Sequence, residues 1–353
     1  QGDWSSDVCS SDLTPILGSI IREHLEWEHV LTYCEAIIRV YNLHGRRDNI
    51  YKARIKILVK ALGIEEFKKQ VEAEWLHLKN SPNTISEAEL KRVNKFFTTM
   101  PYENLSDQDD TYDEAIKNNK AFASWVKRSV HPHKQKGYRA ITLSLKPHGL
   151  APGDATSAQM RIVAELAELY SFGELRVSHE QNLILADVKL KDIFHVWEKA
   201  KAHQLATPNI GLLTDIICCP GGDFCSLANA KSIPIATSIQ EAFDNLDYLH
   251  DIGELELNIS GCMNACGHHH IGHIGVLGVD KDGSEWYQVT IGGKQGNDAS
   301  LGTVIGPSFA AEEMPGVVKK LIDVYIQNRN PEERFIDTVR RLGVNPFKEH
   351  VYA

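Results

Sequence analysis

The sequence has no long apolar run and no excess of positive charge. Spanning a bilayer takes roughly 18 to 20 successive apolar residues, whereas the richest apolar stretch, residues 271–279, is short, interrupted by glycine and contains His273. Lys and Arg number 38 against 47 Asp and Glu, a formal net charge of −9. Nucleic-acid binding needs a basic surface that neutralises phosphates. These two absences argue against a membrane protein and against a nucleic-acid binder.

Cysteine is scarce over most of the chain. Seven are present: Cys9 and Cys34 stand apart, and the others are Cys218, Cys219, Cys225, Cys262 and Cys266. A disulfide-stapled secreted domain is smaller and spreads its cysteines over its whole length. Clustered cysteines in a chain of this size indicate metal or redox chemistry in a reducing compartment. We therefore expect a cytoplasmic protein.

The first residues, QGDWSSDVCSSDL, lack the features of a natural N-terminal segment. They have neither the basic start nor the apolar core of a secretory signal, and they fit no helix or strand period. The string resembles translated sequencing-adapter DNA. We exclude residues 1–13 as non-native, and we expect the chain to be an N-terminally truncated fragment, inactive by itself.

Apolar periodicity predicts an α+β protein with three parts. Residues 14–124 are predicted to be helices followed by an acidic linker, because Leu25, Ile37, Leu58 and similar residues recur at helical steps and Gly63 is placed to end a helix. Residues 125–205 show strands at 138–145, 175–178 and 183–188, with helices at 158–170 and 190–203. This strand–helix–strand–strand–helix order predicts a compact domain.

Residues 206–353 form the third predicted part and contain the clustered cysteines. Strands are expected at 214–219 and 255–259, and a hairpin at 274–279 and 286–291 with Asp282-Gly283 at its turn. A helix is expected at 239–249, with Ser238 as its N-cap. Further helices, from about residue 310 and from about 331, close the chain.

The cysteine spacing is the strongest chemical signal in the sequence. The segment 219–225 reads CPGGDFC and the segment 262–267 reads CMNACG. Four thiolates suit either tetrahedral zinc or an iron–sulfur cluster. Zinc cysteines usually come in pairs two to four residues apart, so the five-residue spacer favours iron–sulfur. Gly221, Gly222, Gly261 and Gly267 fit a cluster too, because glycine lets backbone N–H groups approach sulfur.

Other cysteines and histidines have simpler interpretations. Cys218 is predicted to be a small buried residue at the end of a strand, and Cys34 to lie in a helical core. A second group, His268, His269, His270 and His273, invites a metal-binding interpretation. We instead favour hydrogen bonding near the cysteines, or plain exposure, because the following Ile-Gly alternation predicts a strand.

These motifs resemble the sirohaem-dependent sulfite and nitrite reductases. The cysteine segments occur here within TDIICCPGGDFC and NISGCMNACG, and residues 173–183, GELRVSHEQNL, look like the second ferredoxin-like half-repeat of that family. Residues 41–59 also resemble its bacterial nitrite/sulfite reductase branch, so the resemblance covers the chain from Thr14 onward. It implies a ferredoxin-like half-repeat domain followed by an α/β 4Fe–4S and sirohaem domain, preceded by a helical remnant of the first half.

The resemblance also implies the cofactors and their ligands. Cys219, Cys225, Cys262 and Cys266 would ligate one 4Fe–4S cluster, and Cys266 would also be the axial ligand that bridges to sirohaem iron. Residues expected near the cofactors are Gln181, Asn182, Asn264 and Lys294, with Arg176 and Arg139 as weaker candidates because each could be a surface arginine on a strand. Gln181 could equally be a polar residue at a strand start, and the principal basic residues that contact substrate would lie before Thr14.

The implied activity is six-electron reduction of sulfite to sulfide, or of nitrite to ammonia, in an assimilatory role. Nothing in the chain resembles a flavin- or nicotinamide-binding fingerprint, so the electron donor would be a separate ferredoxin or flavoprotein subunit. The basic stretch 45–56 could dock such a donor or contact sirohaem carboxylates. The competing interpretation is a non-catalytic protein stabilised by zinc or by an iron–sulfur cluster. The sequence does not separate sulfite from nitrite.

Overall fold

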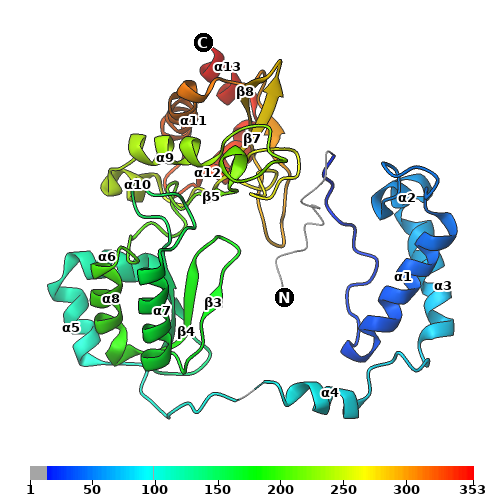
Figure 1. Cartoon of the computed structure of the whole chain (residues 1–353), viewed down its shortest axis with the longest axis horizontal. Helices are drawn as coiled ribbons and strands as arrows, with labels where there is room; N and C mark the ends of the chain where they lie inside the picture. The colour runs from blue at the N-terminus through cyan, green and yellow to red at the C-terminus, as the bar shows by residue number, and fades with distance from the viewer. Residues whose placement is uncertain (1–13, 98) are drawn as a thin grey trace. The chain divides into compact units, whose positions relative to one another are not determined.

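The computed structural model describes residues 14–97 and 99–353 (Figure 1). Segment 1–13, which the sequence analysis set aside, lies outside the described residues. The chain divides into a compact unit of residues 18–101 and a second unit that contains everything from Tyr102 onward. Each unit has its own hydrophobic core.

The unit of residues 18–101 is helical, as predicted. Its elements are η1 (Trp27–His29), α1 (Val30–His44), α2 (Ile55–Leu62), α3 (Ile64–Leu78) and α4 (Glu87–Asn94). The core forms where α1 packs on α3, with Tyr33 and Ala36 against Val71 and Trp75. Gly63 ends α2 with a φ of +80°, a conformation that favours glycine, so the predicted helix stop is confirmed.

The prediction that Cys34 lies in the core is wrong. Its side chain is exposed. The buried stripe of α1 consists of Thr32, Tyr33, Ala36 and Val40. One turn of an α-helix takes 3.6 residues, so Cys34 falls beside this stripe and not on it.

The second unit begins with the predicted ferredoxin-like part. Its elements are α5 (Asp110–Asn118), α6 (Lys120–Ser129), β1 (Val130–Pro132), β2 (Tyr138–Leu143), α7 (Ser157–Tyr170), β3 (Arg176–Val177), β4 (Leu183–Lys189), η2 (Leu190–Asp192) and α8 (Ile193–Ala202). The strands form an antiparallel sheet in the order β1-β2-β4-β3. Ile141, Leu143 and Leu185 share a buried core with Phe122 and Val196 of the helices.

The cysteine-containing part follows. Its elements are β5 (Ile217–Cys218), η3 (Gly221–Asp223), α9 (Ile233–Ala242), α10 (Leu246–Ile252), β6 (Leu257–Ser260), β7 (Ile274–Lys281), β8 (Ser284–Ile291), β9 (Thr303–Val304), η4 (Ala311–Glu313), α11 (Met314–Asn328), α12 (Phe335–Leu342) and α13 (Asn345–Tyr352). The sheet order is β5-β6-β7-β8-β9, with β5, β6 and β7 parallel and the rest antiparallel. Asp282 and Gly283, at φ of +53° and +79°, form the predicted hairpin turn.

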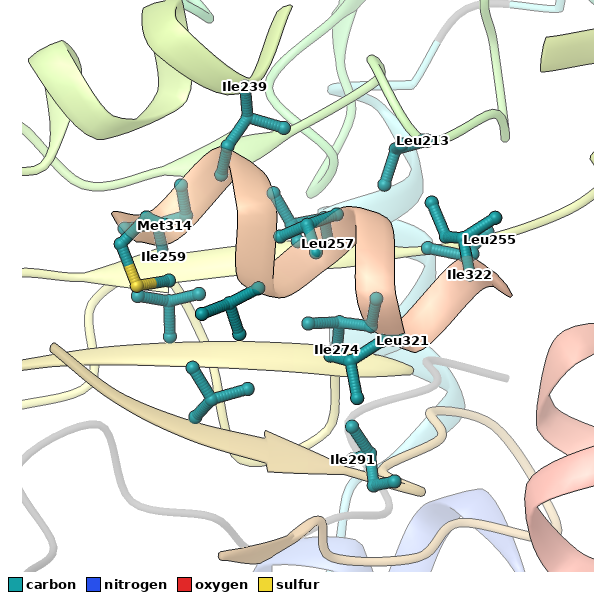
Figure 2. Close-up of a cluster of buried hydrophobic side chains, with 14 of the residues drawn as sticks. Leu213, Ile239, Leu255, Leu257, Ile259, Ile274, Ile291, Met314, Leu321 and Ile322 are labelled. Atoms are coloured by element: carbon teal, nitrogen blue, oxygen red, sulfur yellow. The ribbon is translucent and has the colours of Figure 1, made fainter. Parts of the chain in front are cut away.

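Helix α11 packs on one face of this sheet. Figure 2 shows Met314, Leu321 and Ile322 of α11 among Leu257 and other strand residues. All of these side chains belong to one buried cluster. Alternation along β6 supplies this face, because every second residue of a strand points the same way. The packing of the core therefore fixes the position of β6, which is followed by Cys262 and Cys266.

The predicted helix over residues 239–249 is wrong in its boundaries. Two helices, α9 and α10, meet around Phe243 to Asn245. Asn245 begins α10, because its side chain accepts a hydrogen bond from the Tyr248 N–H. Ser238 lies inside α9 and donates its hydroxyl to the Ile235 carbonyl instead of capping a helix.

Candidate metal centre

Two cysteine loops leave the same edge of the sheet. Cys219 directly follows β5, and Cys262 lies just after β6. These strands pair in parallel with Cys218 opposite Ile259, so their carboxyl ends lie at one edge. The Cys219 N–H also donates to the Ile259 carbonyl, with an N–O distance of 3.1 Å. Strand pairing thus brings together two cysteines that are far apart in the sequence.

Glycine allows these loops to pack closely. Gly221 adopts a φ of +58°, and a Cβ placed on it would lie 2.4 Å from the Ser232 nitrogen. A Cβ on Gly261 would lie 2.6 Å from the Ala230 carbonyl oxygen and 2.9 Å from the Gly221 Cα. Real side chains do not tolerate such distances, so both positions require glycine. Gly221 and Gly261, which were predicted to let backbone N–H groups approach sulfur, also allow the two loops to pack against each other.

The second loop turns tightly between its cysteines. The Ala265 N–H donates to the Cys262 carbonyl at 3.1 Å, and Ala265 adopts a φ of +54°. This left-handed conformation is unfavourable for residues other than glycine, asparagine and aspartate, and it concentrates at functional sites. The turn returns the chain so that Cys266 lies close to Cys262.

The four thiols share one site with unequal exposure. Cys219 and Cys262 are buried, Cys225 is half-buried and Cys266 is exposed. Burial raises the pKa of the Cys266 thiol, and negative charge on Cys219, Cys262 and Cys225 raises it further. Those charges act on Cys266 because the sulfur atoms are near one another. A cation bound among them would reverse this effect and favour four thiolates.

The four cysteines can be compared with the ligand sets of zinc and of an iron–sulfur cluster. Tetrahedral zinc with bonds of about 2.3 Å holds its sulfurs about 3.8 Å apart. Within the described residues, Glu26, Glu28 and His29 are the one group of three possible ligand atoms that lie within 4.8 Å of one another. The four cysteines do not form such a group. A 4Fe–4S cube takes a thiolate at each of its separated iron corners, so the residues present fit that cofactor.

Cys219 has backbone support for the thiolate form. The Gly261 N–H donates to its sulfur, with an N–S distance of 3.1 Å. Cys218, by contrast, is buried, and burial raises the pKa of its thiol. Its S–H donates to the Cys219 carbonyl at 3.2 Å. Cys218 is thus a neutral buried residue at the end of β5, as predicted.

Gln181 holds the backbone beside the cysteines. Its amide accepts from the Cys218 N–H at 2.9 Å and donates to the Cys218 carbonyl at 2.8 Å. Gln181 itself has a φ of +59°. The neighbouring Asn182 is buried, accepts from the Leu145 N–H and donates to the Asp215 carboxylate. Both side chains join the ferredoxin-like part to the cysteine-containing part, and their predicted contact with sirohaem stays a prediction.

The remaining candidates lie in ion pairs or near the cysteines. Arg176 is exposed and paired with Glu174. Lys294 is paired with Asp298 at 2.5 Å, and Arg139 with Asp107 at 2.8 Å. Asn264 lies between Cys262 and Cys266 and is half-buried. Their roles in cofactor binding stay predictions.

The histidines after the second loop differ in burial. His269 and His273 are buried, and burial lowers their pKa values to about 3 and about 4, with smaller contributions from neighbouring positive charge. Both are therefore neutral near pH 7. The Nδ1 atom of His273 accepts a hydrogen bond from the Glu256 N–H at 3.1 Å. The preference for hydrogen bonding over a separate metal site at these histidines stays a prediction.

Two family models match the chain. The model for the nitrite and sulphite reductase 4Fe–4S domain matches residues 12–79 and 212–353. The model for the nitrite/sulfite reductase ferredoxin-like half domain matches residues 131–203. The chain belongs to the nitrite and sulphite reductase family. This membership agrees with the predicted α+β fold and with the predicted cofactors, a 4Fe–4S cluster and sirohaem.

Individual relatives support the same family. The chloroplastic ferredoxin–nitrite reductase of Oryza sativa subsp. japonica is 25% identical over 84% of this chain and 44% of its own length. The assimilatory ferredoxin-dependent nitrite reductase of Haloferax mediterranei is 26% identical over 92% of this chain and 51% of its own. The structure of Mycobacterium tuberculosis NirA has a similar fold, with a TM-score of 0.68, 21% identity, and coverage of 95% and 56%. The chain spans about half the length of the curated relatives it matches.

Sequence reasoning missed several residues of the site. Ser232 approaches the Cys219 sulfur, and no local motif indicates this contact. Phe224, Leu227 and Met263 are exposed apolar residues beside the cysteines. Their positions next to Cys225 and Cys262 were visible in the sequence, but their exposure depends on the loop conformations.

Proposed function

We propose that this chain forms the cluster-binding part of a nitrite or sulfite reductase. Cys219, Cys225, Cys262 and Cys266 ligate the 4Fe–4S cluster, and Cys266 also ligates sirohaem iron. The observation that carries this proposal is the convergence of four thiols where β5 and β6 end. Family membership supports the cofactor assignment.

The exposure of the cysteines supports different roles. Buried Cys219 and Cys262 can face the cluster only, whereas exposed Cys266 has an open side on which a second metal could be bound. Phe224 and Leu227, respectively 79% and 69% exposed, offer apolar surface beside the site. Exposed large apolar side chains often mark a binding surface. A macrocycle stacked there would cover them.

The proposed reaction is six-electron reduction of a small anion. When bound, the coupled cluster and sirohaem supply one-electron transfers to the substrate. The cysteine thiolates hold both cofactors in contact, and the glycine-packed loops keep these ligands in place. Nitrite is the substrate that the names of the relatives support, and sulfite remains within the scope of the family.

The proposed donor is a ferredoxin, because several relatives are named as ferredoxin-dependent. The loop between α1 and α2 carries Arg46, Arg47 and Lys52, with Ile50 and Tyr51 strongly exposed. Basic and apolar groups together suit an acidic protein partner.

None of the described helices has the length and apolar content needed to cross a bilayer. We propose the cytoplasm as the location.

Metal content tests the proposal. The chain is produced anaerobically together with sirohaem-synthesis enzymes, and iron, acid-labile sulfide, zinc and the visible spectrum are measured. About four irons with matching sulfide are expected for the cluster, and about five with sirohaem bands for the coupled centre. Cys262→Ser should abolish the cluster. Cys34→Ser, which alters an exposed cysteine in the helical unit, should not.

Other outcomes of this measurement identify the alternatives. Stoichiometric zinc without sulfide would replace the proposal with a zinc-stabilised protein. A cluster without sirohaem bands would limit this chain to cluster binding, as expected of an inactive fragment. Where both cofactors are present, assays with nitrite and with sulfite decide between the substrates.

A further inference from the structure

Ser232 lies against one of the four cysteines. Its Oγ atom is 3.4 Å from the Cys219 sulfur, and the serine is completely buried. A cysteine that ligates iron is a thiolate and has no proton to donate. In the loaded protein the hydroxyl must therefore be the donor and the sulfur the acceptor. Together with the Gly261 N–H, this gives Cys219 two donors.

The position of Ser232 in the sequence predicts a different use of its hydroxyl. Ser232 is the N-cap of α9, a place where serine normally accepts a hydrogen bond from the second or third helical N–H. Here the side chain makes no such bond. Pro234 occupies the second helical position and has no N–H to offer. Because one of the two N–H groups that a cap normally binds is missing, the Ser232 hydroxyl is available to the Cys219 sulfur.

The surrounding backbone makes room for this contact. A Cβ on Gly221 would lie 2.6 Å from the Ser232 Oγ, and one on Gly261 would lie 3.0 Å from it. The two glycines belong to the two cysteine loops, so Ser232 is enclosed between them. The hydroxyl cannot turn to solvent, because Ser232 is fully buried.

We propose that Ser232 is a positioning residue that raises the reduction potential of the cluster through Cys219. This inference rests on the proposed function, because it requires the cluster. A hydrogen bond to a ligating thiolate withdraws electron density from sulfur and stabilises the reduced, more negative cluster. The amino end of α9, which begins directly after Ser232, adds positive potential on the same side.

The reduction potential of the loaded protein tests this role. The one-electron couple of the cluster is titrated by EPR, with dithionite and mediators supplying the electron, in the parent chain, Ser232→Ala and Ser232→Gly. The midpoint potential should become more negative in both variants. Iron–cysteine stretching bands in the Raman spectrum should move to higher frequency, and their shift in D2O should shrink. The matched control is Ser238→Ala in the same helix, whose hydroxyl bonds only the Ile235 carbonyl.

The outcomes separate this inference from the proposed function. A parent chain without iron and sulfide overturns the proposed function itself. A loaded Ser232→Ala protein with unchanged potential and unchanged D2O shift overturns the role of Ser232 alone. Ser232→Gly removes the hydroxyl but keeps a residue that is common at helix N-caps, so it separates loss of the hydrogen bond from loss of the cap. If neither variant loads a cluster while Ser238→Ala does, Ser232 serves assembly and the tuning role is wrong.

Discussion

Lys146 and Asp215 form a buried ion pair that joins the ferredoxin-like part to the cysteine-containing part. The lysine Nζ lies 2.6 Å from the Asp215 Oδ1, with side chains 0% and 6% exposed. Asp215 also accepts from the Asn182 amide and from the Gly211 N–H. Asp215 lies on the chain shortly before β5, which leads directly into Cys219. It therefore connects the stability of the sheet to the geometry of the site.

Breaking this pair should destabilise the protein strongly. Lys146→Met leaves a buried carboxylate without its cation, and losses of about 3 to 5 kcal/mol are typical of such changes. The double variant Lys146→Met with Asp215→Asn should be less destabilised than the sum of the two single variants. Urea unfolding of the unloaded chain measures both. Lys199→Met, which removes a surface pair with Glu165, is the control and should cost about 1 kcal/mol or less.

Replacing Gln181 distinguishes a structural role from a cofactor contact. Gln181→Ala removes two hydrogen bonds to the Cys218 backbone, so the unloaded chain should lose about 1 to 3 kcal/mol of stability. Gln181→Glu keeps an acceptor for the Cys218 N–H and loses the donor, so it should show an intermediate loss. Unchanged stability of the unloaded chain, with weaker sirohaem binding, would mean that the cofactor contact is the main role of Gln181.

His273 should make the fold sensitive to acid. Burial, aided by the positive charge of Arg334, lowers its pKa to about 4, below the unfolded value of about 6.5. The unfolded chain therefore takes up a proton as the pH falls through 6.5, and the folded chain does so only near 4. Stability from this residue is complete above pH 6.5 and is lost between 6.5 and 4, on the order of 3 kcal/mol in total.

Substitution isolates this contribution. In His273→Gln the fall in unfolding free energy between pH 6.5 and 4 should be smaller by that amount. His195→Gln alters an exposed histidine and should keep the slope of the parent chain. If the unfolding free energy falls equally with pH in the parent chain and in His273→Gln, the pKa of His273 is not lowered in the folded state.

The basic loop between α1 and α2 can be tested as a donor-docking surface. In a protein extended to the length of its relatives, Arg46→Glu with Arg47→Glu reverses charge where an acidic ferredoxin would approach, so ferredoxin-driven turnover should fall roughly tenfold or more, most at low salt. Turnover driven by a reduced dye should not change. Arg92→Glu on α4, in the same helical unit, is the control. Equal losses with both donors would contradict docking and favour a role near the cofactor.

Much of the site could be predicted because its signals are local. The cysteine segments, the Asp282-Gly283 turn and the stop at Gly63 each depend on a few adjacent residues. The contact of Gln181 with Cys218 joins residues 37 positions apart, and no periodic pattern reports such a pairing. The burial of Cys34 was predicted wrongly because the apolar residues of this short helix are consistent with more than one buried face. The division between α9 and α10 depends on the Asn245 cap. The continuous apolar periodicity of this segment instead predicted a single helix.

The arrangement of the two cysteine loops on β5 and β6 has a consequence for the stability of the protein after exposure to oxygen. Between Cys219 and Cys266 the chain forms both α9 and α10, and a bound cluster would close this whole segment as a cross-link does, lowering the entropy of the unfolded chain. Oxygen that destroys the cluster would remove this cross-link at once. Damage at one inorganic centre would then lower the free energy of unfolding and raise the fraction of unfolded chains that proteases can cleave.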